Sequence, residues 1–159
     1  MTEIGKADWE SLYRYWLSKH VDGRPPARDD IDPPTEIPQF VSTMMIIDVL
    51  PSGYQYRLVG SALRDRLGGE LSGKSVGSSR QSDSLKHDWK TLLDAVSGDR
   101  KPRMLVVRGP TGISLSNLIL VLPLINRAGE IECLLAGAFF RYQDFKQDLF
   151  VDDVTIVEI

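Results

Sequence analysis

The sequence predicts an α+β protein in which helices pack on both faces of one five-stranded antiparallel sheet. Three observations support this fold class. The most apolar stretch, Leu115–Phe140, is divided by the turn-forming residues Asn126–Gly129, which predicts neighbouring strands over 115–125 and 130–140. Both faces of these two strands are apolar. The elements predicted before them follow the order helix, strand, strand, short helices, long helix, strand.

The two faces of the 130–140 strand indicate where it lies in the sheet. Its alternate residues form two sets, Ile131, Cys133, Leu135, Gly137 and Phe139 on one face and Glu132, Leu134, Ala136, Ala138 and Phe140 on the other. A strand with one face in water would alternate apolar and polar residues. The hairpin is therefore expected to be central, with a separate layer over each face.

The other elements follow from hydrophobic spacing and turn residues. In chain order they are an amphipathic helix over 7–19, a proline-rich connector over 21–38 with a short helix from Pro34 to Phe40, strands over 43–50 and 54–59, a short helix over 62–67, a long helix over 83–97, a strand over 102–108, the central hairpin, a short helix over 143–149 and an extended tail over 151–159.

These elements predict three parts of the chain. Residues 1–41 hold the first helix and the connector, residues 42–141 form the sheet domain, and residues 142–159 form a C-terminal helix and tail. The helices between the second and third strands must cross one face of the sheet. The opposite face is then left for the N-terminal helix.

Composition restricts the class of protein. The chain has 159 residues, enough for one domain with a substantial core, and a net charge of −3 with basic residues spread along it, which argues against nucleic-acid binding. The single cysteine, Cys133, excludes an internal disulfide and suits a reducing cytoplasm. No signal peptide and no stretch long enough to span a membrane is expected.

The N-terminal helix carries an apolar stripe that must be covered. Trp9, Leu12, Tyr13 and Trp16 recur at helical spacing. They pack on the sheet of their own domain, form the contact surface of a homodimer or other partner, or do both. Deleting residues 1–20 is expected to abolish such a homodimer.

Several stretches resemble the PAS domain, and in particular a bacterial subfamily that sometimes stands alone. They are Leu12–Leu17, Asp30–Pro38, Ile47–Val49 with Tyr56–Gly60, Leu67–Lys74 and Leu122–Leu124, within a resemblance that covers about residues 9–140. The stretch Leu67–Lys74 is similar to the glycine-containing turn after the first PAS helix, with Glu70 and Ser72 as conservative departures. The resemblance implies a sensory or signalling module for a small ligand or a protein partner.

Gly68–Ser75, GGELSGKS, also matches the phosphate-binding loop pattern of nucleotide hydrolases. In that loop Lys74 would contact the terminal phosphates and Ser75 would bind magnesium. Such a loop follows a buried strand and enters a helix, whereas here it follows a short helix. The turn implied by the PAS resemblance explains the same glycines, and a nucleotide binder remains the enzyme alternative.

Cofactor chemistry is not favoured by the remaining candidates. Haem-binding PAS domains use a histidine on the long helix, but His87 points nearly opposite the apolar stripe formed by Leu85, Trp89, Leu92 and Val96. Cys133 lies in a central strand, whereas flavin-reactive cysteines lie on a helix, so a buried structural thiol is expected. No catalytic triad or set of metal ligands can be assembled.

A pocket between the long helix and the sheet is the remaining candidate site. Its predicted lining is Arg57, Leu67, Trp89, Leu92, Val96, Arg108, Asn117, Ala136 and Ala138. The small residues at 136–138 let either a helix or a ligand approach the sheet. The polar members orient an anionic or polar ligand if they face the concave side, and they are solvated if they lie at strand ends.

The sequence therefore predicts a cytoplasmic PAS module without catalytic activity. It binds a small molecule or a protein partner, and its output passes in trans or through a homodimer, because no kinase, cyclase or DNA-binding segment follows. The alternative from another class is an interaction scaffold with a filled core and no ligand.

Overall fold

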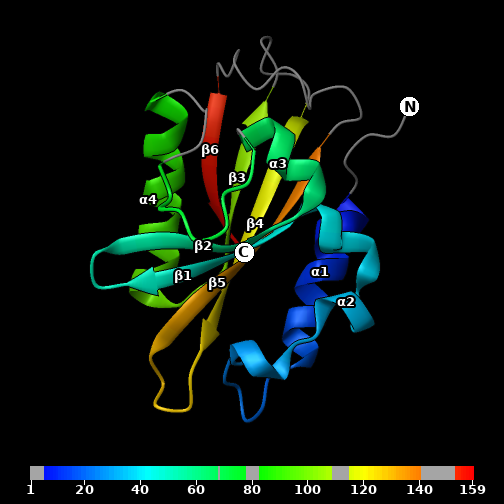
Figure 1. The fold of residues 1–159 in the computed structure, drawn as a ribbon. Coiled ribbons are helices and arrows are strands. Elements are labelled where there is room, and N and C mark those ends of the chain that lie inside the picture. Colours follow the sequence, from blue (N-terminus) through cyan, green and yellow to red (C-terminus); the bar gives the residue numbers. More distant parts are fainter. Residues whose placement is uncertain (1–5, 68, 78–82, 109–114, 141–152) are drawn as a thin grey trace.

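The computed structural model describes residues 6–67, 69–77, 83–108, 115–140 and 153–159 (Figure 1). The elements are α1 (Lys6–Ser18), η1 (Arg28–Asp30), α2 (Pro33–Glu36), η2 (Pro38–Thr43), β1 (Met44–Leu50), β2 (Gly53–Val59), α3 (Ser61–Leu67), α4 (Asp83–Asp99), β3 (Arg103–Arg108), β4 (Leu115–Ile125), β5 (Ile131–Phe140) and β6 (Asp153–Glu158), where η marks a 3₁₀ helix. The helix predicted over 143–149 lies outside the described residues.

All six strands form one antiparallel sheet in the order β2-β1-β5-β4-β3-β6. The predicted α+β class and the central place of the 115–140 hairpin are confirmed. The predicted count of five strands is wrong, because the C-terminal tail pairs with β3 from Arg103↔Glu158 to Arg108↔Asp153. The tail was recognised as extended, but its pairing partner lies about fifty residues away in the chain, beyond the reach of local patterns.

The helices α3 and α4 cover one face of the sheet. α4 contacts β3, β4 and β5, and α3 adds Leu63 to the same cluster. This cluster, called the α4-face core, contains Met45, Ile47, Tyr56, Val59, Leu63, Leu71, Trp89, Leu92, Leu93, Val96, Leu105, Val121, Leu134, Ala136 and Ala138. The predicted helical layer from the middle of the chain is therefore present.

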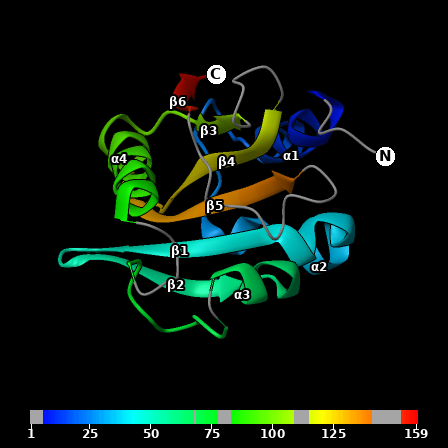
Figure 2. The same ribbon diagram turned by 90° about the horizontal axis from the view of Figure 1, so that it is seen from above.

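The N-terminal helix covers the opposite face, as predicted, and the view from above shows α1 and α4 on different sides of the sheet (Figure 2). Its cluster, called the α1-face core, contains Leu12, Trp16, Ile31, Ile37, Met44, Ile46, Met104, Val106, Leu118, Leu120, Leu122, Leu124, Cys133, Leu135 and Phe139. Two separate apolar layers explain why both faces of the central strands are apolar.

A buried hydrogen bond fixes α1 on this face. The indole N–H of Trp16 donates to the carbonyl of Pro123 over 2.9 Å. The pairing of β3 with β4 ends at Val121, so among the strands that the structure describes Pro123 pairs with β5 alone. Proline lacks an N–H and is accepted in a sheet at such an edge position, where its carbonyl is free to bind a side chain.

The connector between α1 and β1 is ordered and contributes Ile31 and Ile37 to the α1-face core. The single helix predicted from Pro34 to Phe40 is wrong. The chain forms α2 and then η2, with a break at Ile37, whose φ is −138°. The residue before a proline is driven away from helical angles, and Pro38 follows Ile37.

Candidate functional site

The α4-face core brings together most of the predicted pocket lining. Trp89, Leu92 and Val96 of α4 meet Ala136 and Ala138 of β5, and each of these side chains is at most 5 % exposed. The prediction that they share one site is therefore consistent with their position. In this state the side chains themselves fill the space between α4 and the sheet.

The small residues of β5 serve both layers. Ala136 and Ala138 face α4, whereas Gly137 lies under α1, where an added Cβ would overlap the Cδ2 atom of Leu12. Leu12 is fully buried. Of the two predicted explanations for a small residue, close helix packing applies at Gly137. β5 is thus in direct contact with α4 on one side and α1 on the other.

Arg57 does not belong to this pocket, and its predicted place in the lining is wrong. Its guanidinium forms an ion pair with Asp48 at 2.8 Å, and its side chain is 43 % exposed. The register of β1 and β2 pairs Ile46 with Leu58 and Ile47 with Tyr56, so Arg57 is the extra residue of a β-bulge. A bulge interrupts the alternation of faces, and the sequence had left the face of Arg57 open.

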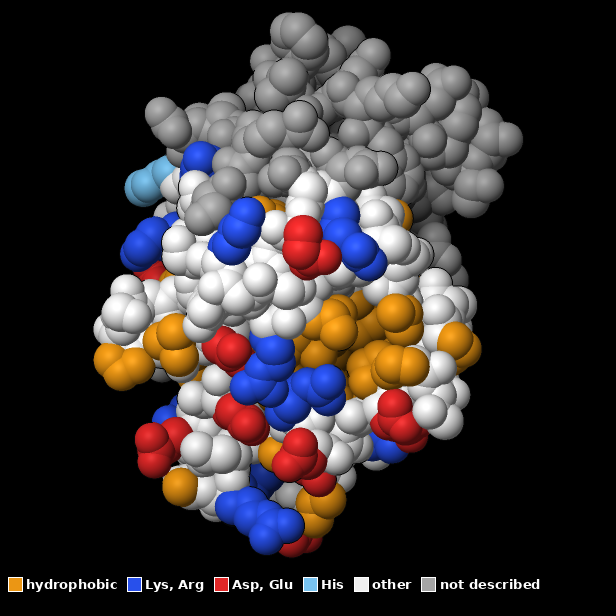
Figure 3. Space-filling view, in the orientation of Figure 1, with side chains coloured by type: hydrophobic (Ala, Val, Ile, Leu, Met, Phe, Trp, Pro, Cys, Tyr) orange, Lys and Arg blue, Asp and Glu red, His pale blue; other side chains and the backbone are white. Residues whose placement is uncertain are grey.

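Arg57 instead borders a surface groove of about 550 Å³ beside α3 and η2. Pro38, Val41 and Leu58 provide apolar lining, and Arg64 lies at the rim near Glu70. Figure 3 shows exposed hydrophobic side chains next to a group of basic ones on the face that β2 and α3 turn to the viewer. The groove brings together residues of η2, β2 and α3, so local patterns in the sequence did not indicate it.

Three further candidates are located only by their backbones. Leu67 ends α3, Arg108 ends β3, and Asn117 in β4 pairs with Val107. The side chains of these three residues belong to the part of the chain that the structure does not describe. Their contribution to a pocket stays a prediction.

The aromatic stripe of α1 is divided between the core and the surface. Leu12 and Trp16 are 0 % and 3 % exposed and are covered by their own sheet. Trp9 and Tyr13 are half-buried and continue outward from Trp16 as a series of ring contacts, with centroid distances of 6.2 Å and 5.9 Å. A partner would therefore meet Trp9 and Tyr13, and the prediction that Leu12 and Trp16 also face it is corrected by their burial.

Comparison with known protein families identifies the fold. The family model described as PAS domain matches residues 6–139, which is most of the chain. The chain belongs to the PAS domain family. Among curated proteins no relative matches, and no solved structure matches either. The resemblance found in the sequence is confirmed at the level of the domain, and PAS domains are sensory and signalling modules.

The glycine-rich turn of this PAS domain is a structural element that covers β2. The N–H groups of Gly73 and Val76 donate to the carbonyls of Tyr56 and Tyr54, and the N–H of Tyr56 donates to the carbonyl of Lys74. A phosphate-binding loop needs such N–H groups free to point at the phosphate. Within Gly68–Ser75 the N–H of Gly73 is instead bonded to β2 and the N–H of Lys74 to the carbonyl of Leu71, which speaks against the nucleotide-binding alternative.

The PAS motif Tyr56–Gly60 ends at Gly60, where no larger residue fits. A Cβ at Gly60 would overlap the backbone of Val41 and Ser42 in η2, and the Gly60 N–H donates to the Met44 carbonyl. The close approach of η2 to the end of β2 therefore requires glycine at this position.

The two residues considered for cofactor chemistry lie where the sequence placed them. His87 is exposed on α4, away from the α4-face core. Cys133 is fully buried on the α1 side of β5, and burial raises the pKa of its thiol to about 12. A thiol with this pKa stays protonated and is a structural residue rather than a nucleophile.

No group of three or more histidine, cysteine, aspartate or glutamate side chains among the described residues is placed to hold a metal ion. None of the described helices is long and apolar enough to cross a membrane.

Proposed function

We propose that this PAS protein is a sensor that responds to a small molecule on the α4 side of its sheet and passes the change to α1. It carries out no catalytic step. The observation that supports this most directly is the 136–138 segment of β5, because adjacent residues contact α4 and α1 from opposite faces.

The coupling depends on how tightly Leu12 fits against Gly137. Interiors packed at crystal-like density transmit displacements instead of absorbing them. A movement of α4 that shifts β5 by a fraction of an ångström changes the space available to Leu12. The α1 helix then shifts its population between two packed positions, and the ligand needs only to favour one of them.

α1 and α2 form one responsive unit. The carboxylate of Glu36 accepts hydrogen bonds from Lys19 and from the Tyr15 hydroxyl, which joins the two helices. These bonds, first that of Lys19 and then that of Tyr15, lower the pKa of Glu36 to about 2. Glu36 is therefore ionised at neutral pH, and a shift of α1 carries α2 with it.

The proposed output is a change in contact with a partner. Trp9 and Tyr13 are half-buried on the outer side of α1, and Leu17 is 42 % exposed. Aromatic side chains of this kind are enriched at protein interfaces. The simplest partner is a second copy of the chain, with a signalling protein in trans as the next choice. We place this function in the bacterial cytoplasm, where a reduced buried Cys133 is expected.

The second candidate function is an interaction scaffold without a ligand. The filled α4-face core favours it, because Leu92, Val96 and Ala136 are fully buried by protein atoms. In that case only α1 and its surroundings would contact a partner.

Native mass spectrometry of the purified protein, combined with an absorbance spectrum, tests these proposals. The sensor proposal expects a dimer whose mass exceeds twice that of the chain by a bound small molecule, or a dimer that gains such mass from a cell extract. A dimer of unmodified mass under both conditions supports the scaffold. A monomer of unmodified mass would contradict the homodimer and the bound ligand together.

A further inference from the structure

A cavity lies beside the α4-face core, between α4 and the turn that joins β1 to β2. It encloses about 470 Å³, within the range of small-molecule sites. α4 contributes Lys86, His87, Trp89 and Lys90, while Ser52 comes from the β1–β2 turn and Ser75 from the glycine-rich turn. The PAS comparison assigns no role to this place.

The charge of this cavity is of one sign. Its described lining residues include three basic side chains, Lys86, His87 and Lys90, and no carboxylate. The phenol of Tyr54 is the other titratable group among them. Figure 3 shows a histidine flanked by basic side chains at the upper left, over α4. The protein has a net charge of −3, so the positive charge around this cavity is opposite in sign to that of the whole molecule.

The carboxylate of Asp94, four residues after Lys90 in α4, is already engaged. Asp94 accepts hydrogen bonds from the Tyr54 hydroxyl at 2.5 Å and from Lys90 Nζ at 2.8 Å. A lysine ammonium has three N–H donors, so Lys90 keeps two after this bond. Burial, followed by the bond to Asp94, raises the pKa of Tyr54 to about 12, so this lining residue stays a neutral phenol.

Apolar and aromatic side chains line the cavity together with the basic ones. Trp89 is 5 % exposed, and Val76 and Tyr54 line the cavity beside it. Trp89 also belongs to the α4-face core. A ligand in this cavity would therefore touch the same helix residue that packs against β5.

We propose that this cavity binds a small organic anion, with a phosphate or carboxylate head group at Lys86 and Lys90 and an apolar part toward Trp89. Ammonium groups attract such head groups, and the hydroxyl of Ser52 is suited to orient them. The effect of this ligand on α1 rests on the proposed function. The binding of the anion to the cavity does not depend on it.

The test uses the full chain, labelled with ¹⁵N, and probes that share one ring. Phenyl phosphate, benzoate and benzyl alcohol differ only in head group, and inorganic phosphate supplies the head group alone. Binding is followed by the amide signals of Gly53 and Gly77 and the indole signal of Trp89. We expect both aromatic anions to bind at least tenfold more tightly than benzyl alcohol, and their order identifies phosphate or carboxylate as the preferred group.

Matched variants locate the binding. Lys86→Ala and His87→Ala change the surface of α4 near the cavity, whereas Lys101→Ala removes an exposed lysine outside it. Lys86→Ala is expected to lower the affinity for phenyl phosphate at least fivefold. Lys101→Ala is expected to leave this affinity unchanged. Equal weakening by both lysine variants, equal binding of benzyl alcohol, or no response of the Gly53, Gly77 and Trp89 signals to either aromatic anion would overturn the site.

The same spectra separate this site from the coupling proposed above. The indole signal of Trp16, on the opposite face of the sheet, reports the position of α1. If Trp89 responds and Trp16 does not, the anion site stands and its coupling to α1 is wrong. If neither responds, the anion site is wrong, while the sensor proposal is still decided by native mass spectrometry.

Discussion

At the scale of single residues, Gly137 has the largest influence on how the two layers meet. Its lack of a side chain lets the fully buried Leu12 reach the backbone of β5. The sequence assigned Ala136 and Ala138 to the pocket face of the strand and Gly137 to the other face. It did not show that Leu12 would lie against Gly137, because that contact joins segments far apart in the chain.

We predict that Gly137→Ala destabilises the protein by about 1–3 kcal/mol, the usual cost of adding a methyl group to a filled core. Urea unfolding measures this loss. Gly98→Ala is the matched control, because its added Cβ meets no atom within 4 Å and lies in α4. It is expected to be neutral or stabilising by up to about 1 kcal/mol.

A second change checks the cause of the Gly137→Ala effect. Shortening the opposing side chain by Leu12→Ala makes room for the new methyl group. The double variant should therefore be more stable than the sum of the two single losses implies. Simple additivity would show that the added methyl group meets something other than Leu12.

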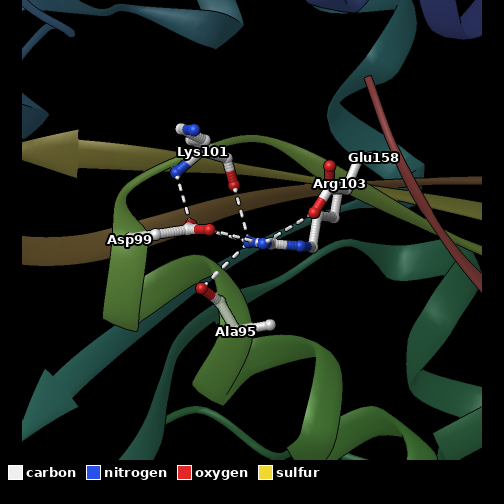
Figure 4. A network of polar contacts seen from close by, with 5 residues as sticks. All are labelled: Ala95, Asp99, Lys101, Arg103 and Glu158. Atoms are coloured by element: carbon white, nitrogen blue, oxygen red, sulfur yellow. Dashed lines mark hydrogen bonds and ion pairs between the residues drawn. The ribbon is translucent and has the colours of Figure 1, made fainter.

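At the scale of elements, Arg103 joins α4, β3 and β6 (Figure 4). Its guanidinium donates to the carbonyl of Ala95 at 2.9 Å in the last turn of α4, to the carboxylate of Asp99, and to Glu158 of β6 at 3.3 Å. The side chain is 10 % exposed. Arginine thus satisfies a helix-end carbonyl and also ties the last strand to the helix.

We predict that Arg103→Lys lowers the free energy of unfolding by about 1 kcal/mol, because lysine keeps the charge but loses the paired bonds of the planar fork. The loss is kept small by the partial exposure of Asp99 and Glu158. Hydrogen exchange should also become faster at the amides of β6.

The control for this change is Arg64→Lys. Arg64 pairs with Glu70 at 3.4 Å, and both side chains are well exposed. Exposed pairs contribute little, so stability should change by less than about 0.5 kcal/mol. Arg103→Lys could lower the free energy of unfolding while hydrogen exchange at the β6 amides stays unchanged. That result would show that Arg103 stabilises the end of α4 and does not hold β6 in place.

At the scale of the whole molecule, two apolar layers share one sheet. Removing α1 leaves the α1-face core in water, including the fully buried Leu120, Leu122 and Leu135. The deletion of residues 1–20 that the sequence suggested as a test of dimerisation is therefore unsuitable. A truncated chain would expose a large apolar patch and aggregate.

The dimer is better tested with the half-buried residues. We predict that Trp9→Ala combined with Tyr13→Ala shifts a homodimer to the monomer in size-exclusion chromatography with light scattering. Truncation of aromatic contacts at an interface costs about 2 kcal/mol or more when they are central to it. Arg14→Ala is the control, since its side chain is 78 % exposed beside Glu10. A double variant that elutes and scatters like the parent would exclude α1 as the dimer surface.

The sequence by itself determined the two layers and most of the helices and strands. Helical spacing of the aromatic residues in α1, the double-sided apolar pattern of β4 and β5, and the turn at Asn126–Gly129 are local signals. Each of them depends on neighbours a few residues apart. The α+β class followed from them and was confirmed, as was the PAS resemblance carried by stretches such as Tyr56–Gly60 and Leu67–Lys74.

Only the tertiary structure decided the register, the sixth strand and the division of the α1 stripe. Arg57 is the extra residue of a bulge and forms an ion pair with Asp48, β6 pairs with a distant strand, and Leu12 and Trp16 are covered by their own sheet. These outcomes depend on contacts between segments far apart in the chain. Their free energies come from packing and pairing across the sheet, to which the local spacing of residues gives no access.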